Sequence, residues 1–175
     1  MFNGFPNRKP DSEKGSNIKS IQRGSATMNA LTVNVAISAV DITKSIVKIY
    51  MRNTAVSGTG YLTANAEITT STNLRLAVVA IIVGTEVVDW EIIEFNNVKS
   101  LQKGTKVVST TSEIVTITGV EPTKSVLFIS WDAPMSSNMH NLSASGELTN
   151  STTITLFQAS SGVVRTIKWQ VIEFN

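Results

Sequence analysis

Glu94 and Glu173 are the carboxylates whose placement first suggests chemistry in this 175-residue chain, because both occupy the same place in a segment that occurs twice. Two carboxylates can act as acid and base on a glycosidic bond. A residue kept in both copies of a repeat is explained more simply as part of the fold, as a strand-end Glu paired with Lys44 or Lys124. We therefore interpret both glutamates as structural and expect a protein that is not an enzyme. A hydrolase using Glu94 or Glu173 is the least favoured alternative.

His140 is the single histidine, and it lies in a polar segment at 136–141. A catalytic histidine needs a nucleophile to serve and an acceptor to orient it, whereas the equivalent place in the first copy, 58–60, reads Gly-Thr-Gly. We interpret His140 as an exposed loop residue. The chain has no cysteine, which excludes disulfides, thiolate metal sites and a cysteine nucleophile, and one histidine excludes a multi-histidine cage. We predict no metal ion and no cofactor.

Three ring-bearing side chains form a candidate glycan contact: Tyr50, Trp131 and His140. They lie near predicted strand ends and loops, where an exposed ring can present its apolar face to a sugar. The alternative is that Tyr50 and Trp131 simply cover the core.

The elements that carry these residues belong to an internal repeat. The segment at 18–24, IKSIQRG, recurs at 98–104 as VKSLQKG, and the segment at 90–96, WEIIEFN, recurs at 169–175 as WQVIEFN. We predict an extended N-terminal arm of residues 1–17, a first unit of residues 18–96 and a second unit of residues 97–175. No linker rich in Pro or Gly separates the units, so we expect them to pack together.

Each unit is predicted to form about six strands. Val, Ile and Thr supply 57 residues, and these types favour strands. Residues 31–37 alternate apolar and polar side chains, as a half-buried strand does. Further strands are expected at 18–23, 46–51, 62–69, from 74 onward and at 87–95, with counterparts in the second copy. The last strand is apolar at both parities, and we favour a central strand over a bulge. The fold class is all-β, with two tandem antiparallel β-sandwich units.

The arm places Phe2, Phe5 and Pro6 beside the basic residues Arg8 and Lys9. A short polar segment of this kind cannot fold by itself. An aromatic tip followed by basic residues suits a peptide that becomes ordered on a partner surface. We predict that these five residues anchor the chain to a partner; the alternative is a frayed terminus.

Charge and hydropathy exclude two classes of partner. The formal net charge of +2 provides no electrostatic footprint for nucleic acid. The longest apolar run, residues 76–83, is far shorter than the about 20 apolar residues that a membrane span needs. The polar start of the chain also lacks the apolar run of a signal peptide. We expect no nucleic-acid partner and no membrane insertion.

The repeat unit resembles small β-domains of bacteriophage virion proteins. The resemblance is carried by the IKSIQRG-like opening, the TKS turn at 43–45, the Ser/Thr-rich LTNSTTITL at 148–156 and the closing WQVIEF at 169–174. It covers residues 18–96 and 97–175, and it implies a place on an exposed part of the particle. The six-strand plan ending in a Trp strand is also similar to the H-type lectin sandwich, which implies trimeric or hexameric assembly and sugar binding.

Together these observations predict a non-enzymatic bacteriophage structural protein on the exterior of the virion, as capsid decoration or as a tail fibre or adaptor. Other virion proteins of the capsid or tail are its expected partners, and two like units per chain suit a homotrimer. The alternative is a carbohydrate-binding, lectin-like module that recognises a glycan on the host surface.

Overall fold

The computed structural model describes residues 16–52, 61–80, 86–136 and 143–175. Within these ranges the chain is almost entirely strand, with a single 3₁₀ turn, η1 (Pro122–Lys124), and it holds no helix long and apolar enough to cross a membrane. The predicted arm residues and His140 lie outside the described residues: Phe2, Phe5, Pro6, Arg8 and Lys9 in the arm, and His140 in the segment 137–142.

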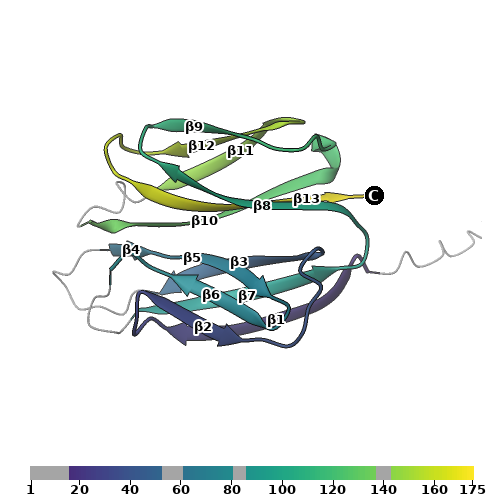
Figure 1. Cartoon of the computed structure of the whole chain (residues 1–175), viewed down its shortest axis with the longest axis horizontal. Coiled ribbons are helices and arrows are strands. Elements are labelled where there is room, and N and C mark those ends of the chain that lie inside the picture. Colours follow the sequence, from purple (N-terminus) through teal and green to yellow (C-terminus); the bar gives the residue numbers. More distant parts are fainter. Residues whose placement is uncertain (1–15, 53–60, 81–85, 137–142) are drawn as a thin grey trace, which may run out of the picture.

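The first unit is a sandwich of two three-stranded antiparallel sheets (Figure 1). One sheet has the order β1-β7-β3 and the other the order β2-β6-β5. The strands are β1 (Ile18–Thr27), β2 (Thr32–Ala36), β3 (Ser45–Arg52), β5 (Asn65–Thr70), β6 (Asn73–Ala77) and β7 (Val87–Phe95).

The second unit repeats this strand order, with β8-β13-β10 in one sheet and β9-β12-β11 in the other. Its strands are β8 (Val98–Val108), β9 (Ser112–Thr116), β10 (Ser125–Ser136), β11 (Ala144–Asn150), β12 (Thr153–Gln158) and β13 (Arg165–Phe174). The predicted all-β fold of two tandem sandwich units with about six strands each is therefore confirmed.

One strand was not predicted as a separate element. The expected strand at 62–69 is divided, and its first part, β4 (Tyr61–Thr63), pairs with β10 at the edge of the second unit's sheet. The segment between β3 and β5 thus contributes a strand to the other unit.

The last strand of each unit is central, as predicted. β7 lies between β1 and β3, and β13 lies between β8 and β10. In the register, Trp90 of β7 stands opposite Gly24 of β1, and Trp169 stands opposite Gly104. A Cβ at either glycine would overlap the indole ring, so the glycine that ends IQRG and the tryptophan that begins WEIIEF form one packing device.

Each unit buries its own apolar core between its two sheets. The first core includes Val47, Leu74, Leu76, Val88 and Ile92, and the second includes Val108, Ile154, Leu156, Ile167 and Val171. Most of these side chains are wholly removed from solvent, which is the main stabilising contribution to a fold of this kind.

The two units also pack on each other, edge to face. The edge strands β3 and β5 of the first unit face the β10-β13 side of the second, which lies above them in Figure 1. The closing phenylalanines Phe95 and Phe174 meet edge to face at 5.2 Å between ring centroids. The first unit therefore presents an edge, and the second presents a sheet surface.

Candidate functional site

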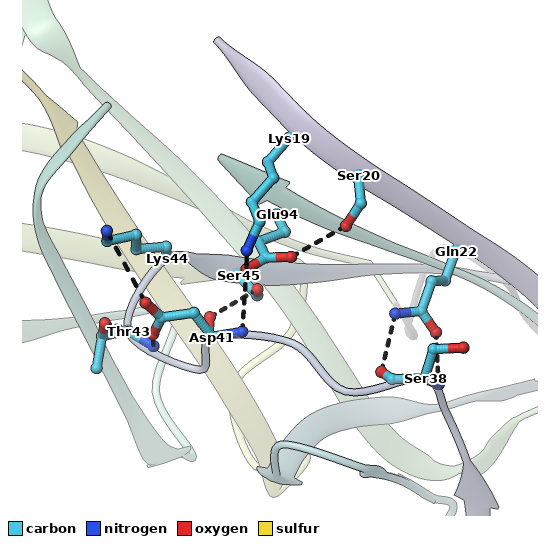
Figure 2. Close-up of polar contacts among 9 residues, drawn as sticks. All are labelled: Lys19, Ser20, Gln22, Ser38, Asp41, Thr43, Lys44, Ser45 and Glu94. Carbon is cyan, nitrogen blue, oxygen red and sulfur yellow. Dashed lines mark hydrogen bonds and ion pairs between the residues drawn. The ribbon is translucent and has the colours of Figure 1, made fainter. Parts of the chain in front are cut away.

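The repeated glutamate lies in a polar cluster at the end of the central strand (Figure 2). Glu94 accepts hydrogen bonds from the Lys19 ammonium at 2.8 Å, the Ser20 hydroxyl at 3.1 Å and the backbone N–H of Asp41 at 3.1 Å. A β-bulge between Ile18 and Ser20 inserts Lys19 as an extra residue opposite Phe95 and Glu94. A bulge of this kind re-aims side chains, and here it lets two consecutive residues reach one carboxylate.

The second unit contains the same cluster. Glu173 accepts from Lys99 at 2.8 Å, Ser100 at 3.2 Å and the backbone N–H of Glu121 at 2.9 Å. The register of β8 against β13 shifts at the matching place. Both carboxylates are almost completely buried, at 3% and 1% exposure.

The expected lysine partners of these glutamates were wrong. Lys19 and Lys99 bind them instead of Lys44 and Lys124. Lys44 lies 3.9 Å from the Asp41 carboxylate within its own turn. The reason is the bulge, which brings the lysine of the neighbouring strand next to the carboxylate. The alternation of side chains along one strand does not predict a bulge in its neighbour.

Both glutamates are held in the ionised form. Burial raises the pKa of Glu94, but its hydrogen bonds outweigh this effect and the net shift is downward from 4.5. The hydrogen bond from Lys99 is the largest of the effects that lower the pKa of Glu173. Two carboxylates that are both ionised, buried and paired tie the strand end to the following turn, and neither resembles an acid poised to give up a proton.

The turn that meets each cluster is stabilised by its own side chains. The Asp41 carboxylate accepts from the backbone N–H of Thr43 at 2.9 Å and from its hydroxyl at 2.6 Å, and the Ser45 hydroxyl donates to the Asp41 carbonyl at 2.7 Å. The hydrogen bond from the Thr43 hydroxyl, followed by that from the Thr43 backbone N–H, lowers the pKa of Asp41. Glu121, Thr123 and Ser125 repeat the arrangement in the second unit. The TKS sequence is therefore turn chemistry.

Glutamine amides form a device that the sequence reasoning missed. The Gln22 amide donates to the carbonyl of Ser38 at 2.9 Å and accepts from its N–H at 2.8 Å. Gln102 does the same with Thr118, at 2.8 and 2.7 Å. Each amide thus imitates one rung of a β-ladder. The signal was present, because the glutamine is kept in both IQRG and LQKG.

The two predicted glycan contacts that lie among the described residues, Tyr50 and Trp131, differ in their exposure. Trp131 is half-buried, packs against the second core and lines a cavity of about 120 Å³ together with Ile49 and Met51 from the first unit. Its ring is engaged in packing, which was the alternative interpretation. Tyr50 is 60% exposed.

Tyr50 stands in an open hollow of about 370 Å³ on the outer surface of the β1-β7-β3 sheet, and this hollow is the candidate site. The other side chains that line it include Arg23, Ser25, Asp89 and Glu91. They form two rows across the sheet, since Asp89 of β7 pairs in register with Ser25 and Tyr50 on its two sides, and Glu91 pairs with Arg23 and Lys48.

Arginine–carboxylate pairs order the floor of the hollow. The Arg23 Nε lies 2.5 Å from Glu91, and Arg52 binds Asp89 through Nε at 2.5 Å and Nη2 at 2.7 Å. The Arg52 hydrogen bond, followed by that of Ser25, lowers the pKa of Asp89. Fixed donors and acceptors beside an exposed ring suit the recognition of a small polar ligand. Among the described residues, no three His, Cys, Asp or Glu side chains gather as they would to hold a metal ion.

Comparison with known proteins adds no relative. No protein family, no curated protein and no solved structure matches the chain.

Proposed function

We propose that this chain is a non-enzymatic structural protein on the exterior of a bacteriophage particle, either a capsid decoration or part of a tail fibre or adaptor. The observation that carries the proposal is that the polar residues retained in both copies bind other parts of the fold. Glu94 and Glu173 each bind a lysine, a serine and a backbone amide. Gln22 and Gln102 complete backbone pairs. What the chain repeats is an architecture, and its motifs resemble those of virion β-domains.

Attachment to the particle is assigned to the N-terminal arm. The arm joins the fold next to the junction of the units, where Asn96 and Asn97 donate their backbone N–H groups to Asn17. The C-terminal Asn175 donates to Asn97 at the same place. The described end of the arm therefore lies where the first unit joins the second.

A homotrimer is the proposed assembly. Two similar units per chain would place six similar sandwiches around a three-fold axis, and closed symmetry is the rule for soluble oligomers. The mass in solution by light scattering should correspond to three chains. A mass of one chain at the high concentrations of a particle surface would refute the trimer.

The deciding experiment for the proposed function is quantitative mass spectrometry of purified phage particles from the source culture. Hundreds of copies per particle would support a capsid decoration. A handful, in multiples of three or six, would support a fibre or adaptor. If the protein were absent from particles, the proposal would be wrong.

Carbohydrate recognition is the second candidate function, and Tyr50 is the observation that favours it. The ring is exposed beside four side chains that donate or accept hydrogen bonds. A protein on the outside of a particle could use such a site on a host-surface glycan. A glycan array with no bound saccharide would count against this candidate while leaving the structural function intact.

A further inference from the structure

We infer that the hollow around Tyr50 binds one neutral pyranose unit of a glycan, and that each chain carries a single such site although its fold is repeated. The inference rests on the second candidate function. It follows from a comparison of the same hollow in the two units.

The second unit has the equivalent hollow, but the first unit covers it. Lys103, Gly104, Lys168, Trp169 and Gln170 occupy the places of Arg23, Gly24, Asp89, Trp90 and Glu91. There the lining is completed by Ala66, Glu67 and Ile68 of β5, and only about 70 Å³ remains. The covered hollow is part of the interface between the units.

Specific polar contacts hold this cover in place. The Lys168 ammonium lies 2.8 Å from Glu67. The Gln170 amide accepts from the N–H of Val47 at 3.0 Å and donates to its carbonyl at 2.9 Å. The Ser130 hydroxyl accepts from the N–H of Ala66 at 3.2 Å. A strand edge is thus the occupant that the second hollow is built to receive.

In the first unit, the three residues that make these contacts are replaced. Tyr50 stands at the place of Ser130, Asp89 at that of Lys168 and Glu91 at that of Gln170. If a second copy docked its own unit in the same way, its Glu147, the counterpart of Glu67, would meet Asp89. Two carboxylates brought together in this way repel each other, and the bulky tyrosine would fill the space that the small serine leaves. The open hollow is therefore suited to an occupant other than this chain.

The chemistry of the hollow matches a sugar ring. Tyr50 offers a rigid apolar surface with a polar tip, on which the C–H groups of a pyranose can pack. Lys48 places its ammonium over one face of the ring, 5.6 Å from the ring centroid, and adds a donor there.

The floor of the hollow supplies donors and acceptors in pairs. Glu91 uses one carboxylate oxygen for Arg23, while an ionised carboxylate has about four acceptor sites. Each guanidinium has donors beyond those already bound to Asp89 and Glu91. Arg23 is paired with Glu91 and Arg52 with Asp89, so the remaining donors and acceptors of these two pairs suit vicinal hydroxyls, which both donate and accept.

The test is saturation-transfer NMR with the full chain and the methyl glycosides of glucose, galactose, mannose and N-acetylglucosamine, with sialic acid as an anionic comparator. We expect transfer to at least one neutral glycoside. Tyr50→Ala should weaken its binding about tenfold, which corresponds to roughly 1.4 kcal/mol. Tyr50→Phe, which keeps the ring surface, should retain most of it.

Phe157→Ala is the matched control. Phe157 is also an exposed ring, at 37%, beside a shallow hollow of about 280 Å³, but that hollow has no charged side chain in its lining. Its loss should leave glycoside binding unchanged, and the thermal midpoint of each variant establishes that it is folded.

Four results would overturn the inference, and they differ in what else they refute. Transfer to no glycoside refutes both the site and carbohydrate recognition by these sugars. Binding that survives Tyr50→Ala refutes this site and leaves carbohydrate recognition standing. Preference for sialic acid, or a self-association that Tyr50→Ala abolishes, assigns the hollow to another occupant. None of them bears on whether the chain belongs to a particle.

Discussion

At the scale of single residues, the repeat keeps those side chains whose exact size or charge the fold uses. Gly24 and Gly104 are kept because an indole lies where their side chains would be. The lysine, serine and glutamate of each cluster are kept because the lysine and the serine satisfy a buried carboxylate. Conservation between the copies thus reports packing and hydrogen bonding.

The first prediction concerns Gly24. In Gly24→Ala the new Cβ would lie 2.7 Å from Cε2 of Trp90, so the ring must move out of a packed core. Such overpacking costs about 1–3 kcal/mol of unfolding free energy. Urea denaturation measures it. Gly119→Ala is the control, since its nearest neighbour, the Thr152 Cγ2, is 3.8 Å away, and an equal loss there would contradict the packing argument.

The second prediction concerns acid. The pKa values of Glu94 and Glu173 are lower in the folded chain than their ordinary 4.5. The stability from their ionised forms is therefore complete above that value, and it is lost as the pH falls through the lower folded pKa values. The free energy of unfolding should decline below about pH 4.5, because the unfolded chain binds protons first.

Glu94→Gln isolates one cluster. It should cost about 1–3 kcal/mol at neutral pH, because the lysine loses its charged partner, and it should flatten the decline in acid. Denaturation at a series of pH values checks both effects. Glu147→Gln, at an exposed position on β11, is the control. A mutant of Glu94 with an unchanged acid profile would show that the cluster does not govern acid stability.

At the scale of elements, glutamine side chains extend the sheets where backbone pairing ends. Gln22 and Gln102 act within a unit, whereas Gln170 of β13 reaches the backbone of β3 in the other unit. A backbone N–H and C=O that are buried need such a partner. The edge of the first unit is thereby closed by a side chain of the second.

The third prediction follows for Gln170→Ala. It leaves the N–H and C=O of Val47 without their partner at a buried interface, and we expect a loss of about 1–3 kcal/mol. Hydrogen exchange of the Val47 amide should accelerate, because local opening no longer breaks that bond. Gln22→Ala, which removes a similar but more exposed pair, should cost less and leave the Val47 exchange rate unchanged. Slow exchange at Val47 in the Gln170 variant would refute the coupling.

At the scale of the whole molecule, the two units have the same fold but different surroundings, because one packs on the other. The edge of the first unit covers the outer sheet surface of the second, and the same surface of the first unit stays open. One surface is therefore an interface and the other a candidate site. The residues differ accordingly, with Lys168 and Gln170 in the first role and Asp89 and Glu91 in the second.

The fourth prediction concerns the arm. Deleting residues 1–15 should leave the unfolding transition unchanged and weaken attachment to the particle. The deletion must stop before Ser16 and Asn17, because these accept hydrogen bonds from Asn96 and Asn97. Co-sedimentation with particles that lack the protein measures attachment, with the intact chain as control. Attachment as strong as that of the intact chain would refute the anchoring role of the arm.

Much of the architecture could be predicted from sequence because its causes are local or repeated. Alternating residues at 31–37, the turn residues at 41–45 and the two copies of the closing Trp strand led to two six-stranded sandwiches with a central last strand. Side-chain parity and turn chemistry act over a few residues. A residue that both copies of a repeat retain is more simply explained by the fold than by chemistry. The two glutamates are interpreted as structural for this reason.

Tertiary structure alone decided the partners. Whether Lys19 or Lys44 binds Glu94 depends on a bulge, and whether a residue pairs across 123 positions, as Gln170 does with Val47, depends on how two units meet. Tyr50 and Trp131 both lie near the ends of predicted strands, yet one ring is exposed and the other packs against the second core. Residues far apart in sequence come together only when sheets pack, and no periodicity within one segment records that packing.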